Sequence, residues 1–345
     1  MSLSYFGYDD CIELLNEHAR VLITPHGGCR VLLYQLTDGP NAIHLDEPRA
    51  ERDGLWESGD DAGGEDAAGW KWTAGQASTG DPFGPTGGRF DVGPEFQASG
   101  PDMRQGNHCA LFFGSWSQTL ACSSLKVELT SPICTSTGLQ LVRVFELEAA
   151  GADLTITQTM RNAGSAASLR VNHWGRTFVP GGGIAFVPLP ADNYSRFPNK
   201  YVLYDFTPPA TILFQPDDPN IAVRDGLIEI GSHNRQAHEK IGFDSDVGWL
   251  GYLSKEGQLL VKRFAVHSER PYGEMAGLTC CVFYYRDRLV ELEPIGPLET
   301  LAPNQEASFV EHWSLLPFPF PQGEGETVDP EAVKSAVEGL APPRL

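Results

Sequence analysis

Apolar and polar residues alternate along most of this chain. In the segment 153–160, Leu154, Ile156 and Met160 fall on one face, whereas threonines fall on the other. A period of two is typical of a half-buried antiparallel strand. The other segments that favour strands are 20–24, 30–36, 125–130, 140–148, 167–173, 227–231, 247–253, 258–266, 278–286 and 306–315. Because Gly, Asn, Asp and Pro turn residues bound these segments, the pattern predicts an all-β fold, an antiparallel β-sandwich.

Two segments depart from this rhythm. Residues 329–340 have the pattern of a short helix, with Pro330 in the first turn, where helices accept proline. The segment near 46–82 is rich in acidic residues and glycine, which predicts a solvated surface loop. No linker separates two hydrophobic cores, so we expect residues 1–345 to form a single domain.

Composition and charge narrow the classes of function. A formal net charge of -20 would repel a phosphate backbone and an anionic membrane surface, so neither partner is expected. The chain has no apolar run of the ~20 residues that a membrane span needs and no visible signal peptide, which favours a cytoplasmic protein. Seven scattered cysteines favour buried reduced thiols. Nucleotide and metal motifs are lacking, so we expect neither a cofactor nor a metal.

The stretch 171–177 is the first that carries residues suited to chemistry. It includes His173, Trp174 and Arg176 at the end of a predicted strand. Imidazole titrates near neutral pH and suits general acid catalysis, whereas an indole ring can stack on a sugar. The alternative for His173 is a structural bond to a neighbouring strand, which is the commoner outcome for such a residue.

A second stretch, 290–297, carries two carboxyl groups. Glu291 and Glu293 share one face of a strand, and Leu292 takes the other. In a polar cleft, repulsion between two carboxylates would raise the pKa of one and provide an acid or a base. The alternative is an ordinary exposed polar face.

The third stretch, 87–96, combines glycines with Arg89 and Glu95. Glycines allow a close approach of backbone and ligand, and a guanidinium can donate several hydrogen bonds to sugar hydroxyls or to a carboxylate. A purely structural Arg89–Glu95 ion pair is equally compatible with the sequence. Lys240 is a further, weaker candidate for ligand binding.

Three segments together resemble aldose-1-epimerase-like proteins, also called galactose-mutarotase-like proteins. RVLITPHGGCRVLLYQL (20–36) resembles their first hairpin, and LRVNHWGRTFVPGG (169–182) resembles the stretch with their catalytic histidine. VELEPIGPLETLAPNQEASFVEHWSL (290–315) resembles their C-terminal end with the catalytic glutamate. The resemblance implies the antiparallel β-supersandwich of the galactose-mutarotase type.

The resemblance also implies an activity, aldose 1-epimerisation by general acid–base catalysis without a cofactor. His173 would be the acid and Glu293 the base, facing each other across one cleft at about 5–9 Å, the separation of paired groups that flank a sugar. Expected substrate-binding residues are Arg89, Glu95, Trp174, Arg176, Lys240 and Glu291. The alternatives are a non-catalytic carbohydrate-binding protein, or a lyase or hydrolase of an acidic saccharide. The partner would be a small or oligomeric carbohydrate, and the oligomeric state is left open.

Overall fold

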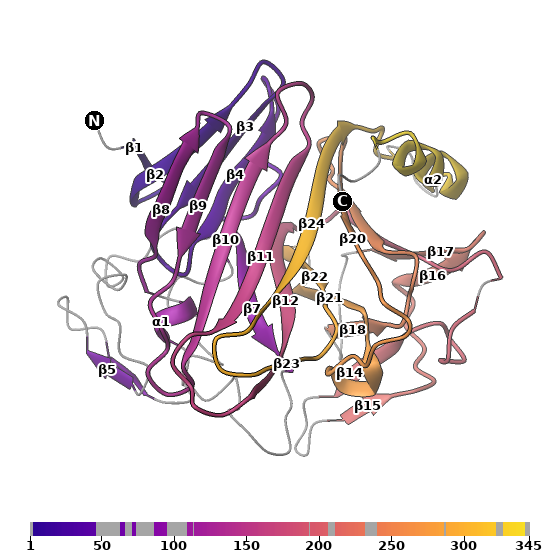
Figure 1. The fold of residues 1–345 in the computed structure, drawn as a ribbon. Coiled ribbons are helices and arrows are strands. Elements are labelled where there is room, and N and C mark those ends of the chain that lie inside the picture. Colours follow the sequence, from indigo (N-terminus) through magenta and orange to yellow (C-terminus); the bar gives the residue numbers. More distant parts are fainter. Residues whose placement is uncertain are drawn as a thin grey trace.

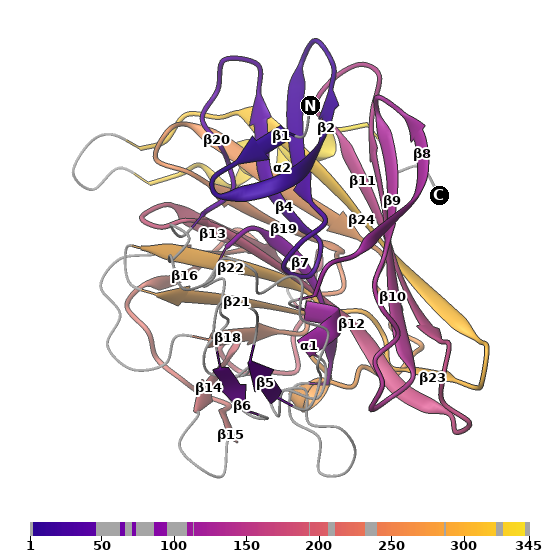
Figure 2. The same ribbon diagram turned by 90° about the vertical axis from the view of Figure 1, so that its left-hand side faces the viewer.

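The structure is a computed structural model of the 345-residue chain. It describes residues 3–45, 63–65, 71–73, 86–94, 109–112, 114–192, 194–205, 211–231, 240–285, 288–321 and 327–341. Within these ranges antiparallel strands dominate, and two large sheets lie against each other as layers (Figures 1 and 2). The predicted all-β sandwich is confirmed.

The first sheet is twelve-stranded and contains the first four strands of the chain together with strands from its second half. In order across the sheet, its strands are β1 (Leu3–Tyr5), β2 (Tyr8–Leu15), β3 (Ala19–Thr24), β4 (Arg30–Leu36), β7 (Gly88–Gly93), β12 (Leu169–Pro180), β22 (Leu289–Pro294), β21 (Cys280–Tyr285), β18 (Lys240–Phe243), β14 (Val202–Asp205) and β15 (Thr211–Leu213), and β23 (Glu299–Leu301) also pairs with β12. The long strand β12 is central and pairs with β7 on one side and β22 on the other.

The second sheet is ten-stranded. In order, its strands are β16 (Ile221–Arg224), β17 (Leu227–Gly231), β13 (Ile184–Pro188), β19 (Trp249–Leu253), β20 (Gln258–Phe264), β24 (Glu306–Pro317), β11 (Leu154–Asn162), β10 (Leu139–Leu147), β9 (Lys126–Thr130) and β8 (Ser117–Ser123). The segment 153–160, from which the period of two was first inferred, lies almost entirely within β11, whose burial alternates at every residue. That alternation confirms the predicted half-buried strand.

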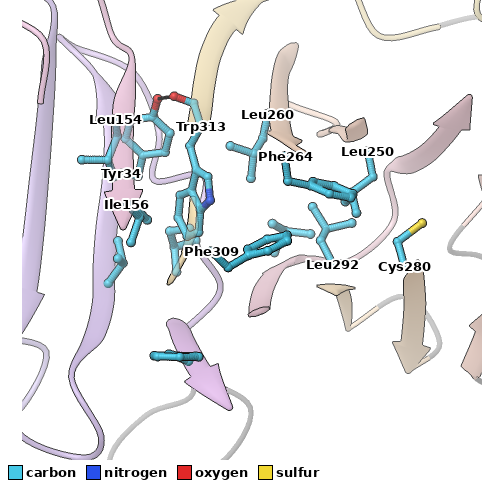
Figure 3. Packing of buried hydrophobic residues seen from close by; sticks show 14 of the residues in the cluster. Tyr34, Leu154, Ile156, Leu250, Leu260, Phe264, Cys280, Leu292, Phe309 and Trp313 are labelled. Atoms are coloured by element: carbon cyan, nitrogen blue, oxygen red, sulfur yellow. Dashed lines mark hydrogen bonds between the residues drawn. The ribbon is translucent and has the colours of Figure 1, made fainter. Parts of the chain in front are cut away.

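The main core lies between the two sheets, because each strand turns alternate apolar residues toward the other layer. Leu154 and Ile156 of β11 and Leu292 of β22 all belong to this core, and all three are fully buried (Figure 3). Tyr34 of β4 also reaches across, and its hydroxyl donates a hydrogen bond of 3.1 Å to the carbonyl oxygen of Trp313 on β24 (Figure 3). Burial of each such side chain contributes about 1.5–3 kcal/mol.

A C-terminal helix covers the other side of the second sheet. Helix α2 (Pro330–Glu338) begins with proline in its first turn, and the side chain of Asp329 accepts a hydrogen bond from the backbone N–H of Glu331. Val333 and Val337 pack in a second core with Phe186 and other sheet residues. The helix predicted over 329–340 is therefore confirmed. The other described helical pieces are short: α1 (Cys109–Phe112) and a 3-10 turn at Met275–Gly277.

The predicted acidic loop and the predicted single domain are tested only in part by the structure. The predicted acidic loop near 46–82 lies outside the described residues, apart from the small hairpin of β5 (Gly63–Glu65) and β6 (Lys71–Thr73). The single domain over 1–345 stays a prediction. The described helices include none that is long and apolar enough to cross a membrane.

The thiols follow the expectation where they are described. Five of the described cysteines are buried thiols: Cys11, Cys29, Cys134, Cys280 and Cys281. The neighbours Cys280 and Cys281 belong to two different clusters on opposite faces of the first sheet, as their positions in one strand require.

Candidate functional site

Strand β12 presents different chemistry on its two faces. His173 and Thr177 point between the sheets, where they bond residues of the second sheet. Trp174 and Arg176 point to the opposite face of the same strand, where they contact Glu293 and Asp91. Because neighbouring side chains of a strand alternate, the motif around His173 is divided between two environments.

Strand β22 divides in the same way. Val290 and Leu292 belong to the core between the sheets, and the carboxyl groups of Glu291 and Glu293 lie on the other face, beside Arg176. The predicted placement of Leu292 in the core, with Glu291 and Glu293 together, is confirmed. The register fixes it, because Thr177 stands opposite Leu292 and Phe178 stands opposite Glu291.

The predicted catalytic pair is wrong in its geometry. His173 and Glu293 lie on opposite faces of the first sheet, so they do not face each other across one cleft. The physical reason is the period of two: His173 is aligned with the inward residues of β12, whereas Glu293 is aligned with the outward residues of β22. No ligand can touch both side chains from one side of the sheet.

The outward face carries a group of charged and aromatic residues that we call the outer cluster. Its members come from β7, β12, β22 and β18, and they are Arg89, Asp91, Asn172, Trp174, Arg176, Lys240, Glu291 and Glu293. The structure thus brings together six of the eight residues predicted for the site, all except His173 and Glu95. Glu95 lies outside the described residues.

Glu293 is the most enclosed carboxylate of the outer cluster. Its Oε2 receives Lys240 Nζ at 3.0 Å and the indole N–H of Trp174 at 3.0 Å. Its Oε1 lies 3.9 Å from Arg176 Nε. Glu293 is 0% exposed, so low-dielectric surroundings strengthen these charge interactions. Glu293 is therefore held in one place by two donors, Lys240 and Trp174, and by a longer ion pair with Arg176.

Arg176 links the remaining acids of the cluster. Its Nε lies 2.9 Å from Glu291 Oε1, and its NH1 lies 3.1 Å from Asp91 Oδ2. Arg89 also pairs with Asp91: its NH2 lies 2.8 Å from the same oxygen, Asp91 Oδ2. The sequence left open an ion pair of Arg89 with Glu95; the described partner of Arg89 is Asp91, two residues along β7 on the same face.

Trp174 does not have the role that the sequence suggested. Lys240 Nζ lies 4.1 Å from the centre of its ring, and the guanidinium carbon of Arg176 lies 4.8 Å from it. The side chain is 3% exposed. The indole therefore holds the two cations through cation–π contacts and is not placed to stack on a sugar.

The two glutamates differ in proton affinity. Burial raises the pKa of Glu291 to about 8, with Arg176 opposing the rise and Glu293 adding to it. Burial also acts to raise the pKa of Glu293, but Lys240 and Arg176 outweigh it and hold that pKa below its ordinary value. At neutral pH the pair therefore consists of a protonated Glu291 and an ionised Glu293.

Four acceptor oxygens of the outer cluster have no hydrogen-bond donor in the described part of the chain. They are Asp91 Oδ1, Asn172 Oδ1, Glu291 Oε1 and Glu293 Oε1. Arg176 Nε approaches Glu291 Oε1 to ion-pair distance without aiming its N–H at it. All four side chains are more than nine-tenths buried. Buried acceptors normally find donors, so this group is suited to a ligand that brings O–H or N–H groups.

On the inward face, His173 belongs to a second group that we call the inner network. Its Nε2 lies 3.1 Å from Glu311 Oε1, and its ring stacks on Phe309 with centres 4.2 Å apart. Burial lowers the pKa of His173, and Glu311 only partly opposes this. His173 is thus a neutral donor bonded to a neighbouring sheet, which is the structural alternative that the sequence left open.

Glu311 on β24 is the centre of the inner network. Its Oε1 accepts from Gln158 at 2.7 Å as well as from His173, and its Oε2 accepts from Trp313 at 2.8 Å and lies 3.0 Å from Lys262 Nζ. Burial acts to raise the pKa of Glu311, but Lys262 and these donors hold it far below its ordinary range. Each carboxylate oxygen therefore has two donors.

Two buried cations of the inner network connect the sheets. Lys262 Nζ donates to Thr177 Oγ1 at 2.9 Å and to the carbonyl oxygen of Leu292 at 3.3 Å, across the β12–β22 pair. Arg143 NH1 donates to the carbonyl oxygens of Cys29 at 2.6 Å and Gly88 at 3.0 Å. The network therefore holds in place the strands whose other face carries the outer cluster.

Two residues of the outer cluster, Asp91 and Asn172, were not predicted for the site, although the strand pattern indicates them. Asp91 shares a face with Arg89 in a strand of alternating pattern, and Asn172 shares a face with Trp174. Glu311 and His312 are adjacent in β24 and point to opposite faces: Glu311 bonds His173 between the sheets, and His312 bonds Thr155 on the other face. Among the described residues, no three His, Cys, Asp or Glu side chains are grouped so as to hold a metal ion.

Comparisons with known proteins identify the fold. No protein-family model and no curated protein matches the chain. Solved structures do match, among them a candidate aldose 1-epimerase of Escherichia coli (13% identity, TM-score 0.52, 89% of this chain and 99% of that one), a candidate mutarotase of Salmonella typhimurium (8%, 0.51, 92% and 93%) and a galactose-mutarotase-related enzyme of Lactobacillus acidophilus (9%, 0.50, 90% and 99%). The chain has the galactose-mutarotase fold, as its sequence predicted.

Proposed function

We propose that the outer cluster binds the hydroxyl groups of a sugar and catalyses exchange between its anomers. The observation that carries the proposal is a set of four buried oxygens, from Asp91, Asn172, Glu291 and Glu293, that have no donor in the described part of the chain apart from the proton shared within the glutamate pair. A sugar offers hydroxyl donors at successive ring positions, which matches acceptors distributed over three neighbouring strands. The fold shared with a candidate aldose 1-epimerase supports the same class of reaction.

The acid and the base come from one strand in this proposal. Ionised Glu293 removes the proton of the anomeric hydroxyl, while protonated Glu291 donates its proton to the ring oxygen. Both oxygens are bonded to the same anomeric carbon, so two adjacent carboxyl groups on one face can reach them together. The bond between the anomeric carbon and the ring oxygen then breaks, and an open-chain aldehyde forms.

Ring closure runs the same transfers in reverse. After rotation about the bond next to the aldehyde, ionised Glu291 takes back the proton from the chain hydroxyl as its oxygen attacks the carbonyl carbon. Protonated Glu293 returns its proton to the carbonyl oxygen, which becomes the new anomeric hydroxyl. Protons and electrons balance with no other reactant. Lys240 and Trp174 hold the Glu293 carboxyl group in position through both steps.

The test combines binding with turnover. Calorimetry with a panel of aldoses should find a ligand, and NMR magnetisation transfer should show its anomers exchanging faster with the protein present. Glu293→Gln should abolish exchange, whereas Glu306→Gln, at an exposed glutamate paired with Arg161, should not change it. If no aldose binds, the proposal is wrong.

Binding without exchange would favour the alternative of a carbohydrate-binding protein, because the unpartnered acceptors support recognition whether or not catalysis follows. A lyase or hydrolase of acidic saccharides has less support. The cations that would hold an acidic ligand, Arg89, Arg176 and Lys240, each lie within ion-pair distance of a carboxylate of the cluster.

A further inference from the structure

A serine, a histidine and an aspartate meet outside the two groups described above. Ser115 Oγ lies 3.0 Å from His26 Nδ1. The other ring nitrogen, Nε2, lies 3.6 Å from Asp10 Oδ2. The three residues come from separate parts of the first half of the chain: β2, the turn between β3 and β4, and the segment before β8. We propose that Ser115, His26 and Asp10 form a nucleophilic site that hydrolyses neutral carboxylic esters.

The local backbone turns Asp10 toward His26. In β2, Tyr8 and Cys11 are buried, and both residues between them are exposed, so the alternation is interrupted by one residue. Asp10 has a φ of 55°, which is rare for a residue other than glycine. An extra outward residue of this kind redirects a side chain, and such irregularities occur next to active sites.

The turn after His26 is equally unusual and is held from inside. Gly27, Gly28 and Cys29 all have positive φ, at 62°, 83° and 56°. A side chain at Gly28 would collide with the carbonyl oxygen of Phe112, which lies 2.1 Å from the position of its Cβ. Fully buried Arg30 donates from Nε to the carbonyl oxygen of Gly27 at 2.6 Å. These contacts fix the backbone next to His26 and so restrict the position of its imidazole ring.

Ser115 is held against the same turn by backbone bonds on both sides. The N–H of Gly28 donates to Gly114 O at 3.0 Å, and the N–H of Trp116 donates to Pro25 O at 2.8 Å. These two bonds fix the backbone on either side of Ser115 and so hold its side chain beside His26.

The arrangement gives each group a role in acyl transfer. Asp10 favours the tautomer with hydrogen on Nε2, which leaves Nδ1 free to accept the Ser115 proton. Ser115 Oγ then attacks the ester carbonyl carbon, and its proton moves to His26. The bond to the alcohol oxygen breaks, and the alcohol leaves with that proton. Water attacks the acyl-serine in the same way, releasing the acid and restoring Ser115.

Charge and exposure define the substrate class. The side chain of Asp10 is 64% exposed and that of His26 is 16% exposed, and Asp9 adds a second exposed carboxylate. Together with the net charge of -20, these groups disfavour an anionic ester. A small neutral ester is the substrate that fits, and the exposed Asp10 should contribute modestly because water screens it.

A serine-reactive fluorophosphonate and p-nitrophenyl acetate test the proposal on the full chain. Peptide mass spectrometry should find the phosphonate on Ser115, and Ser115→Ala should abolish labelling. His26→Gln should lower ester turnover by about 100-fold or more, the size of a general-base contribution. Asp10→Asn should lower it by about tenfold or less. Ser308→Ala, at an exposed serine of β24, is the matched control and should change neither readout.

Two results would overturn the assignment: labelling absent from Ser115 in the folded wild-type protein, or ester turnover unchanged in Ser115→Ala. Melting curves of each variant show that it is folded, and labelling of the wild type needs no variant at all. Since Ser115 lies away from the outer cluster, loss of sugar binding would not affect these outcomes.

Discussion

The inner network and the outer cluster lie on opposite faces of the same two strands, β12 and β22, and both contain buried charges. They differ in how completely their carboxylates are satisfied. Both oxygens of Glu311 have two donors each, all from the protein. In the outer cluster Glu293 Oε2 has two donors, but Glu293 Oε1 and Glu291 Oε1 lack a hydrogen bond. Gln158 Oε1, His173 Nδ1 and Arg143 Nε of the inner network also lack a partner, so the contrast concerns the carboxylates alone. A carboxylate with all its oxygens satisfied indicates a structural role, and one with an open oxygen indicates a place for a ligand.

The largest effect should come from breaking the inner network. Glu311→Ala leaves Lys262 and its other partners buried without their anion, so the free energy of unfolding should fall by about 3–5 kcal/mol. Urea or guanidinium titration of both proteins measures this change. Glu306→Ala removes an exposed glutamate from the same strand and should cost about 0–1 kcal/mol. Similar values for the two variants would contradict the structural role of the network.

In the outer cluster, Lys240→Met should impair activity more than stability. Removing the cation 3.0 Å from Glu293 raises the pKa of that carboxyl, so less of it is ionised at neutral pH. Anomer exchange should fall by about 10²-fold, within the range of general-base effects. The indole N–H of Trp174 donates to Glu293, so its NMR shift reports the same titration without a substrate.

Lys126→Met is the matched control, because Lys126 is a half-exposed lysine paired with Glu146. It should leave both readouts unchanged. An unchanged indole titration in Lys240→Met would show that Lys240 does not set the charge of Glu293.

These contrasts also explain what could be predicted from the sequence. The period of two is local, so it identified β11 and the shared face of Glu291 and Glu293. The local pattern cannot predict which face of β12 carries the site, because the answer depends on which face the second sheet covers. Lys262 from β20 donates a hydrogen bond to Thr177 on the inward face of β12. This contact between strands that are distant in the sequence shows that the second sheet covers that face.

The error over His173 has the same origin. Its resemblance to a family motif assigned a role to one position of a strand, and a shift of one residue moves a side chain to the other face. Trp174 and Arg176 were expected to help bind substrate, and they do lie in the outer cluster, as an anchor of Glu293 and a bridge between acids. The candidate residues were recognisable from the sequence, but their grouping required the register of β12 against β22.

A smaller effect distinguishes the inner network by its pH dependence. Burial holds the pKa of His173 below its usual value, so the unfolded chain binds a proton near pH 6.5 that the folded protein excludes. Stability should therefore be complete above that pH and fall as the pH drops below it, by at most about 1.4 kcal/mol per pH unit. His173→Gln keeps a donor for Glu311 without titrating. Unfolding curves of the two proteins should diverge below pH 6.5, and parallel curves would contradict a buried neutral histidine.

A pH dependence of the opposite sign belongs to the outer cluster. Burial raises the pKa of Glu291 to about 8, so the folded protein keeps a proton that the unfolded chain releases near pH 4.5. This contribution to stability is present below pH 4.5 and is lost as the pH rises toward 8, because the unfolded chain binds fewer protons in that interval. The change is at most about 1.4 kcal/mol per pH unit, the limit for one proton. Glu291→Gln is permanently neutral, so its stability relative to the wild type should increase between pH 5 and about 8. Unfolding titrations at several pH values test this directly. A constant difference would mean that Glu291 is ionised across neutral pH, and the outer cluster would then lack the acid that anomer exchange requires.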